Sequence, residues 1–320
     1  MGFIKKIVRF AAISAGIYLV IAVGLILSQW PAGKVDGDGL HFDRMVLKTP
    51  PIEPEFFTLS DDTRMAVRLF EGDGPLVVVV HGSGGHGSGY NWLAEQFAAG
   101  GAKVVLPDLR GHGLTEGPRG DVQYIGQMED DLAELITTYQ EDGQEVIMVG
   151  HSSGGGLTIR FAGGAHGDML DGAVLIAPFL KHDAPTSRTD AGGWAQPLVR
   201  RFIGLSMLNG VGITAANGMT VMEFNLPEGP LAETMTQAYS FRLNTSYGPR
   251  SDYLADVSKL PKFQLIVGRD DEAFLAEAFE PAMTAATDKG TYHILDGVSH
   301  LDVFLNEEAA ALMVDFVNEF

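Results

Sequence analysis

The chain has 320 residues and a mass of 34.3 kDa, of which 46% are hydrophobic and 20% are charged. This balance is typical of a globular protein and excludes a disordered chain. The net charge of −19 argues against a nucleic-acid partner, because phosphates repel an acidic surface. The absence of cysteine excludes disulfides, thiolate metal sites and cysteine nucleophiles.

The first thirty residues are predicted to be a membrane anchor. Residues 10–27 carry no charge, and as a helix they would extend ~27 Å at ~1.5 Å per residue, close to the ~30 Å hydrocarbon core. Lys5, Lys6 and Arg9 precede this run, and Trp30 follows it at an interfacial position. The positive-inside rule then predicts a single-pass protein with a cytoplasmic N-terminus and an extracytoplasmic main domain, periplasmic in a bacterium.

A cleaved signal peptide is the alternative interpretation, and it would give a secreted protein. Ala22-Val23-Gly24 is an acceptable cleavage site of the small-x-small type. The apolar run continues past that site through residues 25–27, which favours an uncleaved anchor. A buried core helix is disfavoured because no polar face interrupts the run.

The rest of the chain has the alternating pattern of an α/β protein. Residues 31–55 are rich in Pro, Gly and Asp and are predicted to be a linker into a main domain at 56–320. After a predicted hairpin, continuous apolar runs alternate with helix-length segments, which is typical of a doubly wound, mostly parallel sheet. The hairpin strands are predicted at 56–60 and 65–70, and the later strands at 76–80, 103–106, 145–149, 173–177, 263–267 and 291–295. Helices are predicted near 89–100, 122–141, 153–165, 272–288 and 303–319.

One interval departs from this alternation. About eighty residues separate the strand that ends at 177 from the strand that begins at 263, and they contain no clear strand. A loop of that length without secondary structure is uncommon, so a mostly helical insertion is expected. Its apolar clusters include residues 202–205 and 219–224.

Ser152 is the candidate nucleophile, because it lies in a Gly-x-Ser-x-Gly pattern directly after the predicted strand 145–149. Gly150 and Gly154 remove the Cβ atoms that would clash where a strand reverses into a helix. Such a turn would hold the Ser152 hydroxyl at the carboxyl edge of the sheet and leave the backbone N–H of Ser153 free to bind an oxyanion. The pattern alone is weak evidence for a nucleophile, because it can arise by chance in a chain with 40 glycines. The strand predicted before it and the helix predicted after it make it informative.

Two other strand ends supply a candidate base and acid. Strand 263–267 is followed by Asp270 and Asp271, and strand 291–295 is followed by His300. A hydroxyl nucleophile needs a base, and the base needs an orienting carboxylate. The chain order Ser, Asp, His is the order of the α/β-hydrolase triad. Asp183, which follows the preceding strand, remains a further candidate for the acid.

With these features the sequence resembles the α/β-hydrolase family over about residues 56–320, most closely its lysophospholipase and monoacylglycerol-lipase-like branch, which overlaps the serine aminopeptidase S33 group. The resemblance implies that Ser83 supplies the second oxyanion N–H, that Asp271 is the acid, and that a lid occupies about residues 179–260. Ser153 departs from the Met that is common in this branch, which bears on the shape of the acyl pocket. The matching motifs are His81-Gly82-Ser83-Gly84-Gly85, Asp108-Leu109-Arg110-Gly111-His112-Gly113, the Ser152 turn, Gly268-Arg269-Asp270-Asp271 and Gly297-Val298-Ser299-His300.

Cofactor and metal sites are disfavoured. Residues 82–87 match the G-x-G-x-x-G pattern and Asp108 ends the next strand, but a dinucleotide site would leave the three strand-end residues unexplained. We therefore expect no cofactor. We also expect no metal, because no metal-ligand spacing is formed by His81, His86, His112 and His151.

The sequence thus predicts a membrane-anchored serine hydrolase that cleaves carboxylic esters through Ser152, His300 and Asp271 by way of an acyl-enzyme. An apolar insertion above the site of a membrane-tethered domain suits acyl chains, so the expected substrate is a small-molecule ester or a lipid, that is, a lipid-derived or other carboxylic ester. The same triad hydrolyses amides, so a peptidase of the S33 aminopeptidase type is the alternative. A catalytically inactive hydrolase fold that acts as a binding module is the third interpretation.

Overall fold

The computed structural model describes residues 2–29, 40, 47–188, 193–226 and 234–320. Trp30 and most of the predicted linker at 31–55 lie outside the described residues.

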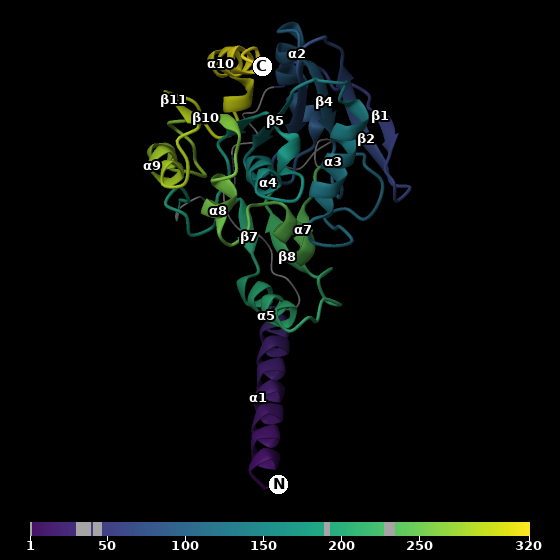
Figure 1. The fold of residues 1–320 in the computed structure, drawn as a ribbon, viewed down its shortest axis with the longest axis vertical. Coiled ribbons are helices and arrows are strands. Elements are labelled where there is room, and N and C mark those ends of the chain that lie inside the picture. Colours follow the sequence, from purple (N-terminus) through teal and green to yellow (C-terminus); the bar gives the residue numbers. More distant parts are fainter. Residues whose placement is uncertain (1, 30–39, 41–46, 189–192, 227–233) are drawn as a thin grey trace.

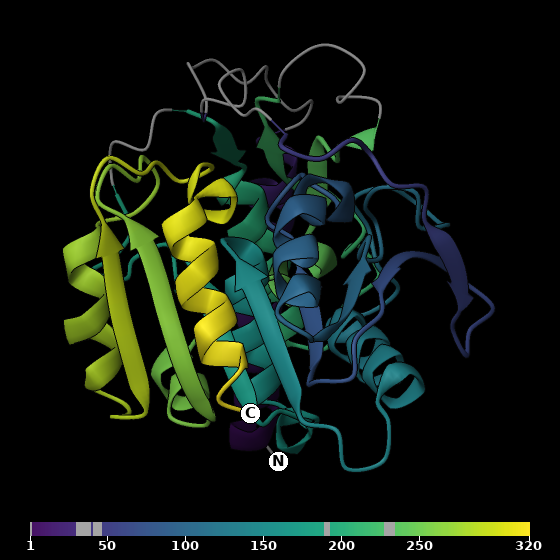
Figure 2. The same ribbon diagram turned by 90° about the horizontal axis from the view of Figure 1, so that it is seen from above.

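A mostly parallel sheet of eight strands forms the centre of the fold (Figures 1 and 2). The strands are β1 (Glu55–Thr58), β2 (Arg64–Phe70), β3 (Leu76–Val80), β4 (Lys103–Pro107), β5 (Val146–His151), β6 (Gly172–Ile176), β10 (Lys262–Gly268) and β11 (Gly290–Leu295). They lie in the order β1-β2-β4-β3-β5-β6-β10-β11, in which β2 is antiparallel to β1 and to β4 and all other neighbours are parallel. The predicted hairpin and parallel sheet are therefore confirmed.

Helices cover both faces of this sheet. Figure 2 shows α2 (Asn91–Ala99) and α10 (Glu307–Val317) side by side on one face, with α4 (Ser153–Ala162) behind the sheet. Every residue of β3, β5 and β6 is buried as a result, which explains why these strands are apolar without alternation. The remaining helices outside the insertion are α3 (Gln127–Tyr139), α9 (Phe279–Thr284) and the short 3₁₀ helices η2 (Gly87–Tyr90), η3 (Gly167–Met169), η4 (Ala276–Ala278) and η5 (Val303–Leu305).

The segment between β6 and β10 differs from the expectation. It contains the helices α5 (Val199–Gly210), α7 (Phe241–Ser246) and α8 (Tyr253–Val257), but also a second, three-stranded antiparallel sheet. The strands of this sheet are β7 (Ala195–Pro197), β8 (Thr220–Phe224) and β9 (Ala238–Ser240). The expected helices are therefore present, but the three strands were not anticipated, because strands of three to five residues are too short to produce a clear periodicity.

The N-terminal helix α1 (Gly2–Leu27) extends away from the rest of the molecule, with α5 at its C-terminal end (Figure 1). It is long and apolar enough to cross a membrane. Almost all of its side chains are exposed, and only Ala22 and Ile26 are buried. An exposed apolar helix at this position indicates a membrane anchor or a signal sequence.

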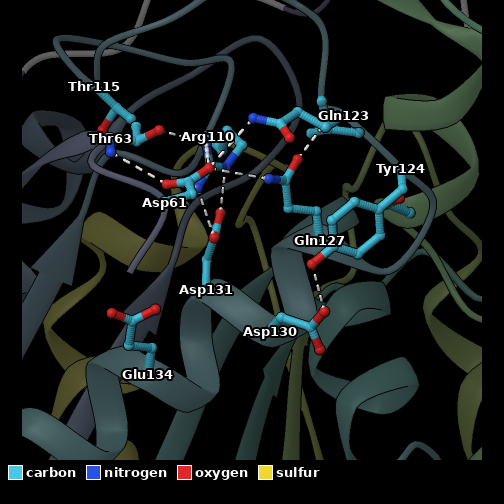
Figure 3. Close-up of polar contacts among 12 residues, drawn as sticks. Asp61, Thr63, Arg110, Thr115, Gln123, Tyr124, Gln127, Asp130, Asp131 and Glu134 are labelled. Carbon is cyan, nitrogen blue, oxygen red and sulfur yellow. Dashed lines mark hydrogen bonds and ion pairs between the residues drawn. The ribbon is translucent and has the colours of Figure 1, made fainter. Parts of the chain in front are cut away.

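A buried guanidinium connects three segments on the β1–β2 side of the fold (Figure 3). Arg110, in the loop after β4, donates to both carboxylate oxygens of Asp131 on α3, at 2.7 and 2.8 Å. It also donates to Thr63 at 2.8 Å and to Asp61, in the turn between β1 and β2. Burial disfavours the charge, but the hydrogen bonds with Asp131 and Asp61 outweigh it and raise the pKa of Arg110, so the group stays charged.

We expect Asp131→Asn to lower the free energy of unfolding by about 3 kcal/mol, because the buried guanidinium loses its charged partner. Glu116→Gln is the control, since it breaks an ion pair with Arg64 in which both side chains are half exposed. That change should cost about 1 kcal/mol or less. Urea unfolding in detergent measures both values, and equal losses for the two variants would contradict this account of Arg110.

Candidate active site

Ser152 lies at a sharp turn between β5 and α4, and the backbone there is strained. Its φ of 54° lies in the left-handed region that non-glycine residues rarely adopt. The turn is tight because α4 packs directly on the ends of two strands: a Cβ at Gly154 would lie 2.3 Å from the carbonyl oxygen of Val80, and one at Gly150 would lie 2.4 Å from that of Gly154. Glycine at both positions therefore allows the turn.

The residues that follow three strands bring together a hydroxyl, an imidazole and a carboxylate, which are linked by hydrogen bonds. His300 follows β11, and Asp271 follows β10. Nε2 of His300 lies 3.0 Å from the Oγ of Ser152, and its Nδ1 lies 2.7 Å from Oδ2 of Asp271. The other carboxylate oxygen, Oδ1, accepts the backbone N–H groups of Ala273 and Phe274 at 2.8 and 2.7 Å. With Nδ1 donating to the carboxylate, Nε2 is left to accept the proton of the serine hydroxyl.

The other two candidates for the acid lie elsewhere. Asp270 is exposed, and Asp183 is exposed and paired with Lys181 at 3.2 Å. Asp271 is fully buried, as is nearly all of His300. Of the three carboxylates, Asp271 is the one in contact with the imidazole.

The backbone N–H groups of Ser83 and Ser153 are the candidate oxyanion donors beside Ser152. Within the described residues, neither the N–H of Ser83 nor that of Ser153 has a hydrogen-bond partner. Ser153 is the first residue of α4, where the first N–H groups lack partners inside the helix. The hydroxyls of the two serines lie 2.5 Å apart, so the two segments that carry these N–H groups are in direct contact. This pair can bind an oxyanion.

The N–H groups on either side of Ser83 are held by buried tyrosines. Gly82 donates to the hydroxyl of Tyr90 at 3.1 Å, and that hydroxyl lies 2.7 Å from Nδ1 of His151. Nε2 of His151 lies 3.0 Å from the carbonyl oxygen of His300, which can only accept, so Nε2 carries the proton and Tyr90 donates to Nδ1. A continuous row of hydrogen bonds, through Tyr90 and His151, thus joins Gly82 to the backbone of His300.

A second row of the same kind begins at Gly84. Its N–H donates to the hydroxyl of Tyr239 at 2.6 Å, which in turn lies 2.7 Å from Nε2 of His112. Nδ1 of His112 lies 3.1 Å from the carbonyl oxygen of Arg110, so here Nδ1 carries the proton. Tyr239 belongs to β9, and the insertion therefore holds the loop that carries Ser83.

The two histidines of these rows are neutral, as is His81, whose ring centroid lies 4.9 Å from that of His112. Burial lowers the pKa of His81 to about 4 and the pKa values of His112 and His151 well below the ordinary 6.5. Burial also raises the pKa values of Tyr90 and Tyr239, so their hydroxyls keep their protons. Within the described part of the chain, no group of His, Asp or Glu is arranged to hold a metal ion.

The pocket over Ser152 is mainly apolar and encloses about 660 Å³, part of it open to solvent. Ser152, His300 and Ser83 lie among its lining residues, at the carboxyl edge of the sheet. Its other lining residues include Leu40, Leu47, Tyr90, Trp194, Met235, Leu301 and Phe304.

The roles of Tyr90 and Tyr239 could not be predicted from the sequence. The tyrosines lie 61 and 127 residues from the histidines that they contact, and no local pattern marks such pairs. His151 precedes the nucleophile, its Nε2 lies 3.0 Å from the backbone carbonyl oxygen of His300, and the centroids of the two rings are 4.8 Å apart.

A family model described as "Serine aminopeptidase, S33" matches residues 74–307. Among curated proteins, Phospholipase YtpA of Bacillus subtilis is 29% identical over 105 residues, which cover 33% of this chain and 40% of the relative. Monoacylglycerol lipase of Mycolicibacterium smegmatis is 35% identical over 111 residues, with coverages of 34% and 39%. Monoglyceride lipase of Rattus norvegicus is 32% identical over 116 residues, with coverages of 36% and 38%. The matched part thus spans 40% or less of each relative.

Solved structures match over much more of the chain. A soluble variant of monoglyceride lipase from Saccharomyces cerevisiae, in complex with a substrate analog, aligns with a TM-score of 0.66 and 16% identity over 86% of this chain and 98% of that one. Monoacylglycerol lipase from Paleococcus ferrophilus aligns with a TM-score of 0.59 and 19% identity over 79% and 98% of the two chains. These similarities establish the α/β-hydrolase fold.

We expect Tyr239→Phe to lower kcat for an ester about tenfold with KM unchanged, because the buried N–H of Gly84 loses its acceptor and the loop of Ser83 is less well held. Tyr292→Phe is the matched control, since within the described residues the hydroxyl of Tyr292 has no hydrogen-bond partner. Steady-state kinetics on a p-nitrophenyl ester measures both. A kcat within twofold of wild type for Tyr239→Phe would contradict the role given to this hydroxyl.

The neutral histidines predict that stability falls on acidification. The unfolded chain binds protons at these histidines as the pH falls below ~6.5, whereas the folded chain resists protonation until the pH approaches the lowered values. The free energy of unfolding should therefore decrease from pH 7.5 to 5.5, by up to ~1.4 kcal/mol per pH unit for each such histidine. Urea unfolding at several pH values measures the slope. His112→Asn should make it shallower, and an unchanged slope would show that His112 is not held neutral.

Proposed function

The chain belongs to the serine aminopeptidase S33 family of α/β hydrolases, and we propose that it hydrolyses carboxylic esters of lipid origin at the surface of a membrane. The coarser part of this statement, a serine hydrolase of the lipase or esterase type, follows from the family and from the named relatives. The finer part concerns the residues that act, the substrate and the location.

In the proposed reaction Ser152 is the nucleophile and His300 is its base. The imidazole takes the hydroxyl proton as Oγ attacks the carbonyl carbon, and Asp271 orients the ring and stabilises its charged form. The acyl-enzyme then forms as the alcohol leaves with a proton from His300, and water activated by His300 releases the acid. The observation that carries this proposal is the contact of His300 with both Ser152 and Asp271, at 3.0 and 2.7 Å.

The oxyanion of each tetrahedral intermediate would be bound by the N–H groups of Ser83 and Ser153. Support comes from their lack of other partners within the described residues, since a donor already in use would not be available. The tyrosine contacts of Gly82 and Gly84 fix the loop between them before substrate arrives. Such preorganised donors stabilise charge that develops in the transition state.

The apolar pocket supports a substrate with an acyl chain. Leu40, Leu47, Trp194 and Met235 offer hydrocarbon and aromatic surface around Ser152, where burial of each CH₂ contributes ~0.8 kcal/mol. This class of substrate also agrees with the names of the relatives reported above, two of which are lipases and one a phospholipase. We propose no nucleic-acid partner, because the net charge of −19 disfavours one.

The family description favours one alternative, an aminopeptidase, because the same triad cleaves amides. An aminopeptidase would need an anionic group for the N-terminal ammonium of its substrate. Among the described residues that line the pocket there is no Asp or Glu. This composition favours an uncharged ester over a peptide with a free amino terminus.

We propose that α1 is retained as an anchor, with the N-terminus in the cytoplasm and the hydrolase domain outside it, in the periplasm in a bacterium. The bases Lys5, Lys6 and Arg9 support this orientation. Cleavage after Gly24 would remove Tyr18, whose hydroxyl donates to the carbonyl oxygen of Met207 at 2.8 Å, so this contact favours an intact chain. Secretion after cleavage is the alternative.

A fluorophosphonate probe tests the nucleophile directly. We expect the full-length protein to be labelled and Ser152→Ala to be unlabelled, with a loss of at least ~10³-fold in ester turnover. Ser153→Ala is the matched control, because it removes a neighbouring hydroxyl but keeps the backbone N–H, and it should still be labelled. Circular dichroism shows that each variant is folded. Labelling of Ser152→Ala would overturn the assignment, and a folded but unlabelled wild type would favour the inactive binding module.

Turnover on p-nitrophenyl esters of increasing chain length, compared with aminoacyl anilides, then tests the substrate class. We expect the esters to be preferred, with activity rising as the acyl chain lengthens until it fills the apolar pocket. Higher activity on the anilides would favour the aminopeptidase.

A further inference from the structure

The insertion between β6 and β10 packs closely along α1 through its helix α5. Gly204 of α5 faces the C-terminal part of α1, where a Cβ would lie 2.5 Å from the carbonyl oxygen of Ala22 and 2.7 Å from Cγ1 of Ile26. Only a residue without a side chain lets the two backbones approach this closely. Small residues at such contacts are typical of helices that pack within membranes.

Hydrogen bonds extend this contact along α1 and define the direction of α5. The backbone N–H and the guanidinium of Arg201, near the start of α5, donate to the side-chain and backbone oxygens of Gln29, at 2.9 and 2.7 Å. Near the end of α5, the carbonyl oxygen of Met207 accepts the hydroxyl of Tyr18 at 2.8 Å. α5 therefore runs antiparallel to α1, from the level of Gln29 toward the level of Tyr18.

The length of α1 fixes the depth at which α5 lies. If the part of α1 alongside α5 were outside the lipid, only residues 10–17 of the uncharged run would remain to cross it. Eight residues extend ~12 Å at ~1.5 Å per residue, less than half of the ~30 Å hydrocarbon core. The anchor can cross the membrane only if its contact with α5 also lies within the hydrocarbon.

The exposed side chains of α5 and of the turn after it are mainly apolar, and Arg200 is the one charged group among them at residues 199–213. The exposed apolar side chains are Val199 (52% exposed), Ile203 (45%), Val211 (54%) and Ile213 (41%). Residues 191–222 contain no Asp or Glu, although the chain has 41 of them in 320 residues. The acidic charge of the protein is thus absent from the segment beside the anchor.

The backbone donors of the turn after α5 are satisfied internally, as hydrocarbon requires. The backbone N–H groups of Val211, Gly212 and Ile213 donate to carbonyl oxygens of Leu208 and Asn209 at 2.9 to 3.1 Å. The side-chain amides of Asn209 and Asn217 bind each other through two hydrogen bonds, at 2.6 and 2.9 Å. The turn can therefore enter lipid without exposing unpaired backbone donors.

From these observations we propose that α5 and the turn at residues 211–213 are embedded in the membrane leaflet on the side of the hydrolase domain, in contact with lipid acyl chains. The partner of this apolar face is the bilayer itself. The inference rests on the proposed retention of α1 as an anchor. Trp194 lines the pocket and lies five residues before the start of α5, so the embedded helix continues directly from one wall of the site.

Spin labelling tests this depth, and the absence of cysteine makes single labels possible without further changes. Ile203→Cys and Val211→Cys would each carry a nitroxide in the full-length protein, reconstituted in phosphatidylcholine vesicles. Ile17→Cys on α1 is the control for hydrocarbon, and Asp142→Cys, in an exposed loop, is the control for water. The readout is the ratio of collision rates with oxygen and with a water-soluble nickel chelate.

We expect the ratios at Ile203 and Val211 to approach that at Ile17 and to exceed that at Asp142 at least tenfold. Ester turnover equal to that of wild type shows that each labelled variant is folded. Ratios at Ile203 and Val211 equal to that at Asp142, with Ile17 in hydrocarbon, would overturn the proposal and leave the anchor intact. A water-like ratio at Ile17 as well would instead show that α1 is not a membrane anchor, and the embedding of α5 would fail with it.

Discussion

The site depends on one tight packing contact, between the first turn of α4 and the ends of β3 and β5. The strained φ of Ser152 costs of order 1–3 kcal/mol, and it persists only because the surrounding backbone leaves no relaxed alternative. The carbonyl oxygen of Val80 fills the space that a side chain at Gly154 would need. This contact directs the Ser152 hydroxyl toward the pocket and brings the start of α4 beside the loop of Ser83, so nucleophile and candidate oxyanion donors are set by the same constraint.

The two rows of hydrogen bonds, one through Tyr90 and one through Tyr239, connect this packing contact to the rest of the molecule. Tyr90 of η2 contacts the loop at Gly82, whereas Tyr239 of β9, in the insertion, contacts it at Gly84. The insertion also packs along α1 through Gly204. The insertion that contacts α1 is therefore also the insertion that holds Gly84, in the loop of Ser83. Under the proposed function, anchoring and catalysis share this structural support.

Much of this could be predicted from the sequence, because its signals are local. The buried strands are continuous apolar runs, and Ser152 lies within a five-residue pattern after one of them. The choice of Asp271 over Asp270 and Asp183 needed the family resemblance, since all three follow strand ends. The role of Tyr239 could not be predicted, because its partners Gly84 and His112 are 155 and 127 residues away. The short strands of the insertion form by pairing with each other rather than by their own periodicity.

The most direct test of the central claim is a crystal structure of the protein after reaction with a phosphonate inhibitor. We predict a covalent bond from phosphorus to the Oγ of Ser152. The phosphonyl oxygen should lie ~2.7–3.1 Å from the backbone nitrogens of Ser83 and Ser153. His300 should remain in contact with Asp271. Phosphorus bound to another residue, or a phosphonyl oxygen directed away from both nitrogens, would contradict the account.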